Sequence, residues 1–220
     1  MLTTYVAANP VASLVIAHGA GAGQSSPFMT KFARGMVERG ISAATFDFPY
    51  MRNRRKVPDK AEVLEGCWRD AIVAAQNELG NVPLFIGGKS MGGRIASQVA
   101  AGEHAPIAGL IYLGYPLHPP GKPQQLRDAH LPKIAEPMLF VQGARDAFGT
   151  VDEIKGLLPR LQRATIFEVA GGDHSFKVTG RGRTPDQVMA EVMDAVAEWI
   201  RGRVNESDRE PRTLDRGSKT

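Results

Sequence analysis

Cysteine is nearly absent from this chain. The single residue, Cys67, cannot form a disulfide within the 220 residues. A lone cysteine is compatible with a reducing compartment, so we expect a cytoplasmic protein. Long apolar runs are missing too, because no segment offers the roughly 18 consecutive apolar residues that a membrane-spanning helix needs. The first residues also lack the basic stretch, apolar stretch and cleavage site of a secretory signal. We therefore predict neither secretion nor a membrane partner.

A strong excess of one charge is lacking as well. Lysine and arginine together number 27 against 23 acidic residues, which leaves a net charge of +4. Proteins that bind nucleic acid usually concentrate much more positive charge on one face, so we predict no nucleic-acid partner. One local cluster, Arg-Asn-Arg-Arg-Lys at residues 52–56, is dense in cations. It could attract an anionic substrate, although a solvated basic loop is the commoner explanation.

The composition is that of one globular domain with a polar end. Hydrophobic residues make up 43% of the chain and charged residues 23%, which is enough apolar material for a buried core. A length of 220 residues fits a single α/β domain. We place that domain at residues 1–203. Residues 204–220 are almost entirely polar and predict a flexible tail, because they offer too little apolar area to offset the entropy of ordering.

From residue 13 onward, short apolar runs alternate with longer segments of helical periodicity. This alternation is typical of parallel strands joined by crossover helices, and it predicts an α/β fold with a mostly parallel central sheet and helices on both faces. The predicted strands are residues 13–17, 43–48, 82–86, 107–113, 138–142 and 165–169. The predicted helices are residues 27–39, 61–79, 91–101, 151–158 and 185–200. Residues 2–8 are compatible with a further, antiparallel strand at the edge.

The sharpest functional motif is Gly-Lys-Ser-Met-Gly at residues 88–92. It directly follows an apolar run and opens a helical segment, which is the context of a nucleophile elbow. In such an elbow the serine occupies a strained turn between strand and helix, and the positions two residues away on either side must be small. Gly88 and Gly92 meet that need. The motif therefore predicts Ser90 as a nucleophile, with a glycine-rich structural turn as the weaker alternative.

A serine hydroxyl needs a histidine base, and the histidine needs a carboxylate to orient it. Asp146 comes just after the predicted strand 138–142, and His174 comes just after the predicted strand 165–169. Because the carboxyl ends of parallel strands lie at one edge of the sheet, both side chains can converge on Ser90 there. Asp173 is adjacent to the histidine and misplaced to orient it, and Asp152 lies too far into a helix. The sequence thus predicts a Ser90–Asp146–His174 triad.

A glycine-rich segment, His-Gly-Ala-Gly-Ala-Gly at residues 18–23, follows another predicted strand. It resembles the loop after the third strand of α/β-hydrolases, where a backbone amide pairs with the amide after the nucleophile to form an oxyanion hole. The resemblance implies Met91 and Ala20 for these roles, with Gly21 in reserve. A dinucleotide-binding loop is the competing interpretation, and it is weak because the Gly-x-Gly-x-x-Gly spacing fails.

Three residues are candidates for substrate binding: His118, Tyr50 and Gly21. His118 follows the predicted strand 107–113 and opens on the same edge as Ser90; a solvated loop histidine is an equally good interpretation. Tyr50 leaves another strand end, next to the basic cluster. Gly21 belongs to the His-Gly loop.

Nearly all of residues 13–200 resemble the α/β-hydrolase superfamily. The motifs that carry this likeness are His-Gly-Ala-Gly, Phe-Asp-Phe-Pro-Tyr, Gly-Lys-Ser-Met-Gly-Gly-Arg, Gly-Tyr-Pro-Leu-His-Pro-Pro-Gly-Lys and Gly-Ala-Arg-Asp-Ala-Phe-Gly. The pattern is similar to the small lidless branch that includes the testis-expressed and NSL-complex-subunit-type proteins, relatives of dienelactone hydrolases. That likeness implies a fold without a cap domain, in which only residues 117–131 can act as a partial lid. Ser90 stands where dienelactone hydrolases carry cysteine, which makes dienelactone a doubtful substrate.

These features predict a serine hydrolase that cleaves a small ester or related acyl bond through an acyl-Ser90 intermediate. The predicted chemistry needs no cofactor and no metal, and the predicted partner is a small-molecule substrate. The oligomeric state, the acyl group and the leaving group stay open. The alternative is a non-catalytic scaffold or interaction protein that has kept a hydrolase fold. The presence of a complete triad and two glycine loops favours the enzyme, since a scaffold needs none of them together.

Overall fold

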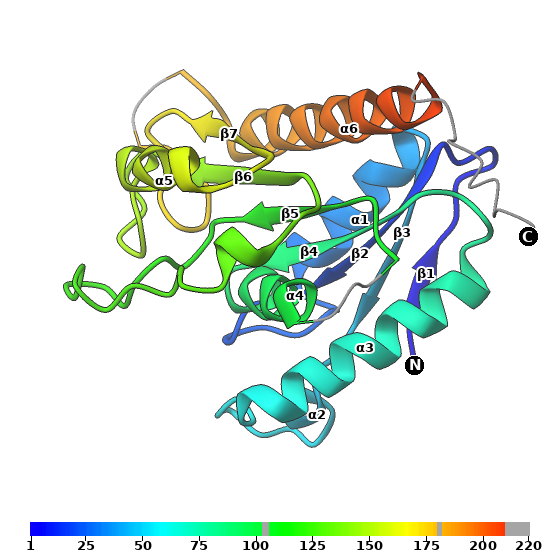
Figure 1. Cartoon of the computed structure of the whole chain (residues 1–220), viewed down its shortest axis with the longest axis horizontal. Helices are drawn as coiled ribbons and strands as arrows, with labels where there is room; N and C mark the ends of the chain where they lie inside the picture. The colour runs from blue at the N-terminus through cyan, green and yellow to red at the C-terminus, as the bar shows by residue number, and fades with distance from the viewer. Residues whose placement is uncertain (103–105, 180–181, 210–220) are drawn as a thin grey trace, which may run out of the picture.

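A seven-stranded sheet forms the centre of the molecule (Figure 1). The computed structural model describes residues 1–102, 106–179 and 182–209. The strand order is β1-β3-β2-β4-β5-β6-β7, and all neighbours pair in parallel except β1 with β3. The strands are β1 (Thr3–Tyr5), β2 (Ala12–Ala17), β3 (Ile41–Phe46), β4 (Leu84–Lys89), β5 (Gly109–Leu113), β6 (Met138–Gly143) and β7 (Ala164–Val169).

Helices cover both faces of the sheet. Helices α1 (Pro27–Glu38) and α6 (Pro185–Arg209) lie on one face, and α3 (Ala61–Glu78), α4 (Met91–Gly102) and α5 (Val151–Leu157) lie on the other. The pleat of the strands divides the core accordingly: in β2, Leu14 and Ile16 pack toward α1 and α6, while Val15 and Ala17 pack toward α3 and α4. Each face of the central strands is covered by one of these hydrophobic clusters, and burial on both faces explains why their sequences are nearly continuous hydrophobic runs.

The predicted α/β fold with a mostly parallel sheet is confirmed, and so is the antiparallel edge strand near the N-terminus. The ends of several elements differ from the prediction. Strand β3 ends at Phe46 rather than residue 48, because Asp47 turns out of the sheet and its Oδ1 accepts a hydrogen bond from the Gln24 amide at 2.7 Å. The short helix α2 (Pro49–Arg52), which follows directly, was not predicted.

Helix α6 is longer than its apolar stripe indicated. It runs to Arg209, so residues 204–209 of the predicted tail are helical, and Val204 packs against the core cluster of α1 and α6. The prediction of a flexible tail concerned residues 204–220, and residues 210–220 lie outside the described part of the chain. The polar composition alone did not show that the helix continues past its buried face.

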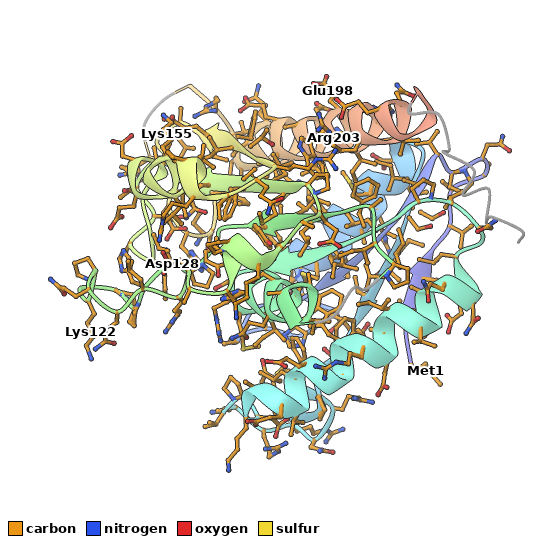
Figure 2. The ribbon with its side chains drawn as sticks, viewed as in Figure 1. Met1, Lys122, Asp128, Lys155, Glu198 and Arg203 are labelled. Atoms are coloured by element: carbon orange, nitrogen blue, oxygen red, sulfur yellow. The ribbon has the colours of Figure 1, made fainter. Side chains whose placement is uncertain are left out.

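No cap domain stands over the carboxyl edge of the sheet in the described ranges. The longest excursion there is the loop between β5 and the short 3₁₀ helix η1 (Leu131–Lys133). Its tip, marked by Lys122, points away from the sheet (Figure 2). None of the helices in the described residues has both the length and the apolar character needed to cross a bilayer.

Candidate active site

Ser90 occupies the tight turn between β4 and α4. Its backbone is left-handed, with a φ of 52°, and its amide donates to the Leu113 carbonyl at 3.1 Å. A Cβ at Gly88 would lie 2.2 Å from the Ala17 carbonyl oxygen, and one at Gly92 would lie 2.4 Å from the same atom. Only glycine fits at these two positions, because β2 passes directly behind the turn. The side chain of Ser90 is thereby held outward at the carboxyl edge of the sheet.

The three residues predicted as a triad are joined by two hydrogen bonds. His174 Nε2 is 2.9 Å from Ser90 Oγ, and His174 Nδ1 is 2.7 Å from Asp146 Oδ2. A carboxylate accepts hydrogen bonds, so the Nδ1 proton points at Asp146 and leaves Nε2 free to accept the serine proton. Chemically, this geometry would let a serine act as a nucleophile, with the histidine as its base and the carboxylate orienting that base.

Asp146 is buried and receives two further hydrogen bonds. Gln142 Nε2 donates to Oδ2 at 2.9 Å, and the Phe148 amide donates to Oδ1 at 2.8 Å. These donors compensate the carboxylate for lost water and hold its plane toward His174. The ring of Phe148 also lies against the imidazole, with 4.2 Å between ring centroids. Sequence reasoning missed Gln142, although its position at the end of β6, four residues before the acid, was a usable signal.

Two residues beside Ser90, Ala20 and Met91, have backbone amides that are available as hydrogen-bond donors. Both residues line the cavity that opens beside Ser90, and neither amide donates a hydrogen bond to any other residue in the described ranges. Met91 begins α4, so its amide is one of the unpaired donors at a helix N-terminus. Free donors at such a place suit an oxygen that gains negative charge. Gly21 lines the same cavity from the His-Gly loop.

His18 holds that loop in place. The side chain is buried; its Nδ1 lies 2.7 Å from the Gly19 carbonyl oxygen, and its Nε2 accepts the Phe48 amide at 3.2 Å. A ring that donates from one nitrogen and accepts at the other is neutral, and burial lowers the pKa of His18 accordingly. The histidine of the His-Gly motif is therefore a structural residue that joins the loop to the end of β3.

Two residues expected to bind substrate do not line the cavity. Tyr50 is fully buried behind the loop, where its hydroxyl donates to the Ala20 carbonyl at 3.1 Å and where burial raises its pKa to about 12. His118 is buried as well, with Nε2 3.1 Å from Glu153 Oε1 on α5. Both predictions of direct substrate contact are corrected on this point. The sequence located their strand ends but could not show which way the side chains point.

The basic cluster at residues 52–56 also lies outside the cavity lining. Arg55 pairs with Asp59 at 2.5 Å, and Arg52 donates to the Cys67 sulfur at 3.5 Å. Cys67 is half-buried, and burial raises the pKa of its thiol. The cluster is a largely exposed surface loop, which agrees with the commoner of the two interpretations considered from the sequence.

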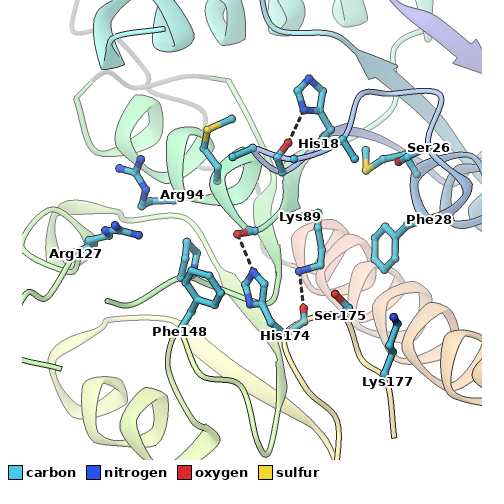
Figure 3. Close-up of a pocket in the computed structure, with 18 residues that line it drawn as sticks. His18, Ser26, Phe28, Lys89, Arg94, Arg127, Phe148, His174, Ser175 and Lys177 are labelled. Atoms are coloured by element: carbon cyan, nitrogen blue, oxygen red, sulfur yellow. Dashed lines mark hydrogen bonds between the residues drawn. The ribbon is translucent and has the colours of Figure 1, made fainter. Parts of the chain in front are cut away.

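A cavity of about 700 Å³ opens beside Ser90. It is bounded by the His-Gly loop, the start of α1, the elbow, the loop that follows β5 and the loop of His174 (Figure 3). Within the described residues, no three His, Cys, Asp or Glu side chains gather as a metal site would require.

Lys89, the residue just before Ser90, is the main feature that sequence reasoning overlooked. Its Nζ donates to the His174 carbonyl at 2.6 Å and lies 5.6 Å from the centre of the Phe176 ring. Burial lowers the pKa of Lys89 from its ordinary 10.5 to about 8, despite the opposing attraction of Asp146 and Asp173. Lys89 thus connects the end of β4 to the loop that carries His174.

Replacing Lys89 with methionine is expected to change how stability depends on pH. The unfolded lysine keeps its proton up to about pH 10.5 and the folded one only up to about pH 8. The buried charge therefore costs free energy below pH 8, and this cost fades as the pH rises toward 10.5. Between pH 7 and pH 10 the wild type should therefore gain about 2–3 kcal/mol in its free energy of unfolding from this residue, and Lys89→Met should not. The stability of the variant minus that of the wild type should fall by the same amount.

Urea unfolding at the two pH values measures this difference. Lys122→Met is the matched control, because Lys122 is exposed and its loss removes no buried charge. A Lys89→Met difference that stayed the same at both pH values would contradict the burial of a charged amine at this position.

The chain matches the sequence model of a family described as Alpha/beta hydrolase domain over residues 10–201. Among solved structures, Est1E from Butyrivibrio proteoclasticus with bound ferulic acid has a TM-score of 0.70 at 15% identity, covering 93% of this chain and 96% of its own. A dienelactone hydrolase from Anabaena variabilis has a TM-score of 0.72 at 18% identity, covering 91% and 90%. A serine hydrolase without a lid from Xanthomonas campestris has a TM-score of 0.65 at 16% identity, covering 94% and 88%.

At these sequence identities, the structural similarity shows the fold and no more. The family model is independent of that likeness and spans most of the residues from β2 to α6. The elbow, the seven-stranded sheet and the absence of a cap domain in the described ranges agree with it. The chain therefore belongs to the alpha/beta-hydrolase family and has the fold of a hydrolase.

Proposed function

We propose that this protein is a serine hydrolase that cleaves a small ester or related acyl bond through a covalent acyl-Ser90 intermediate. The observation that carries the proposal is the unbroken chain of hydrogen bonds from Asp146 through His174 to Ser90. These residues come from three separate loops of one sheet edge, and a purely structural role would not require them to meet in this order.

In the proposed acylation step, Ser90 Oγ attacks the carbonyl carbon of the substrate and His174 Nε2 takes the hydroxyl proton. The carbonyl oxygen becomes an oxyanion and accepts hydrogen bonds from the amides of Ala20 and Met91. As the tetrahedral intermediate collapses, His174 returns its proton to the leaving oxygen and the bond to the leaving group breaks. Asp146 keeps the imidazole in one tautomer and stabilises its charged form.

Deacylation repeats these steps with water in place of the serine. His174 removes a proton from the water, the hydroxide attacks the acyl carbon, and the proton passes to Ser90 Oγ as the acid product leaves. Every proton that leaves one oxygen reaches another through Nε2. The reaction as proposed consumes one ester and one water and uses no cofactor. We also propose the cytoplasm as the place of action and a small molecule as the substrate.

A fluorophosphonate probe tests the proposal directly, because it reacts with an activated serine and spares an ordinary one. The wild-type protein should be labelled at one site, and mass mapping should locate the label on Ser90. Heat-denatured protein is the control, since unfolding separates Ser90 from His174. Folded wild-type protein that resists labelling would favour the scaffold alternative.

A further inference from the structure

The cavity beside Ser90 is lined by positive charge. Four of its lining side chains are cationic, and no aspartate or glutamate is among the residues that line it in the described part of the chain. The cations are Lys89, Arg94, Arg127 and Lys177. Figure 3 shows the two arginines on one side of the cavity, across from Phe28 and Lys177. A cavity lined in this way raises the local concentration of anions.

Neither arginine forms an ion pair among the described residues: Glu65 acts on Arg94 through its charge alone, and its carboxylate lies 3.5 Å from Arg69. Arg94 Nη1 donates to the neutral side chain of Gln98 at 3.3 Å. The acid next to Arg127 in sequence, Asp128, is engaged by Arg160 at 2.5 Å instead. Burial and the charge of Arg127 both lower the pKa of Arg94, yet a guanidinium keeps its proton at any physiological pH. The pair therefore holds two like charges that a counter-anion would stabilise.

The backbone of both Arg94 and Arg127 is held by hydrogen bonds to other parts of the structure. The Arg127 amide donates to the Leu117 carbonyl at 2.8 Å, and its carbonyl accepts the hydroxyl of the buried Tyr115 at 2.7 Å. Arg94 belongs to the first turn of α4, where its amide donates to the Ser90 carbonyl at 3.1 Å. That hydrogen bond spans a single turn, so the Arg94 backbone lies one turn away from Ser90.

The lysines on the cavity wall are less suited to the same task. Lys89 already donates to the His174 carbonyl. Lys177 is exposed, so water screens its charge. Arginine also presents a planar fork of donors that matches a carboxylate or phosphate group, which an ammonium does not.

We propose that Arg94 and Arg127 form a subsite for an anionic group, a carboxylate or a phosphate, carried by the substrate a few bonds from the scissile acyl carbon. This inference rests on the proposed function and specifies its substrate class: short anionic esters rather than neutral ones. The anion would supply the ion pair that neither arginine makes and would fix the ester carbonyl next to Ser90.

Pairs of esters that differ in one charge test the subsite by turnover. On the acyl side, 4-nitrophenyl hemisuccinate is compared with its methyl ester; on the leaving side, 4-acetoxybenzoate is compared with its methyl ester. Wild-type kcat/KM should favour the anionic member of at least one pair by about tenfold or more. Arg94→Met and Arg127→Met should each lower that ratio by about ten- to hundredfold, the loss expected for a hydrogen-bonded charge.

The ratio is the readout because general damage to the catalytic centre lowers both rates of a pair together. Lys122→Met is the matched control: it removes one positive charge from the loop that carries Arg127, at the tip that points away from the sheet (Figure 2). Its ratio should equal that of wild type. Arg94→Lys should keep part of the preference, since the charge remains and the fork is lost. No preference in either pair, or a ratio that both methionine variants leave intact, would overturn the subsite.

A binding measurement separates this inference from the proposed function. Calorimetry with succinate, with inorganic phosphate and with neutral succinamide needs no turnover. Succinate or phosphate should bind wild type at least about tenfold more tightly than succinamide, and Arg127→Met should remove the difference; the tighter of the two anions identifies the group. Equal binding of all three compounds would reject the subsite even in an active serine hydrolase. Anion binding without fluorophosphonate labelling would keep the subsite and reject the hydrolase.

Discussion

Ser90→Ala is expected to lower kcat by about a millionfold, the typical loss when a triad hydrolase is deprived of its serine. The variant removes the atom proposed to attack the substrate, while the amides of Ala20 and Met91 stay where they are. The fold should persist, because the lost Oγ bonds only His174 among the described residues and leaves no buried charge unpaired. Hydrolysis of 4-nitrophenyl acetate gives the rate, and the melting temperature reports the fold.

Ser25→Ala is the matched control for this substitution. Ser25 is exposed on the loop that follows the His-Gly motif, and it is not among the residues that line the cavity. The control should hydrolyse the ester at the wild-type rate. Purified Ser90→Ala that retained most of the activity would eliminate Ser90 as the nucleophile.

The second large effect is expected from His174→Ala, which should lower kcat by at least about a thousandfold, as loss of a triad base does. No other described side chain bonds Ser90 Oγ, so the serine would keep its proton. His118→Ala provides a matched comparison, because it makes the same chemical change in the loop that follows β5. Because His118 faces Glu153 instead of the cavity, its loss should change kcat/KM by about tenfold or less.

Measuring kcat and kcat/KM of both histidine variants on one small ester shows which histidine serves as the base. The melting temperature of His118→Ala is the internal check, since the loss of the contact with Glu153 acts on stability rather than on chemistry. An inactive His118→Ala beside an active His174→Ala would show that the triad has been assigned to the wrong histidine.

The local motif at residues 88–92 was enough to predict the elbow, because its small residues and its place between strand and helix are properties of adjacent sequence. Asp146 and His174 could be proposed from their positions after predicted strands, since parallel strands bring their carboxyl ends to one edge. Gln142, Lys89 and the arginine pair could not. Their roles depend on which distant group each side chain contacts, and neither the periodicity of apolar residues nor the spacing of motifs predicts such contacts.

Side-chain direction was the other limit. Tyr50 and His118 follow strand ends as predicted, yet one turns behind the His-Gly loop and the other turns toward α5. The basic residues 52–56 drew attention because they are adjacent in sequence. Arg94 and Arg127 line the same cavity but are 33 positions apart in the sequence. Neither belongs to a sequence motif that would predict a binding site.

By itself, the sequence determined the alternation of strands and helices, the strained serine turn and the chain order of the three triad candidates. These follow from apolar periodicity, glycine placement and chain direction, which act over a few residues at a time. Only the tertiary structure decided where β3 and α6 end, which amides stay free beside Ser90 and which charges share a cavity without a counter-ion. The reason is physical: burial, electrostatic repulsion and hydrogen-bond partners arise between atoms that folding brings together from distant parts of the chain.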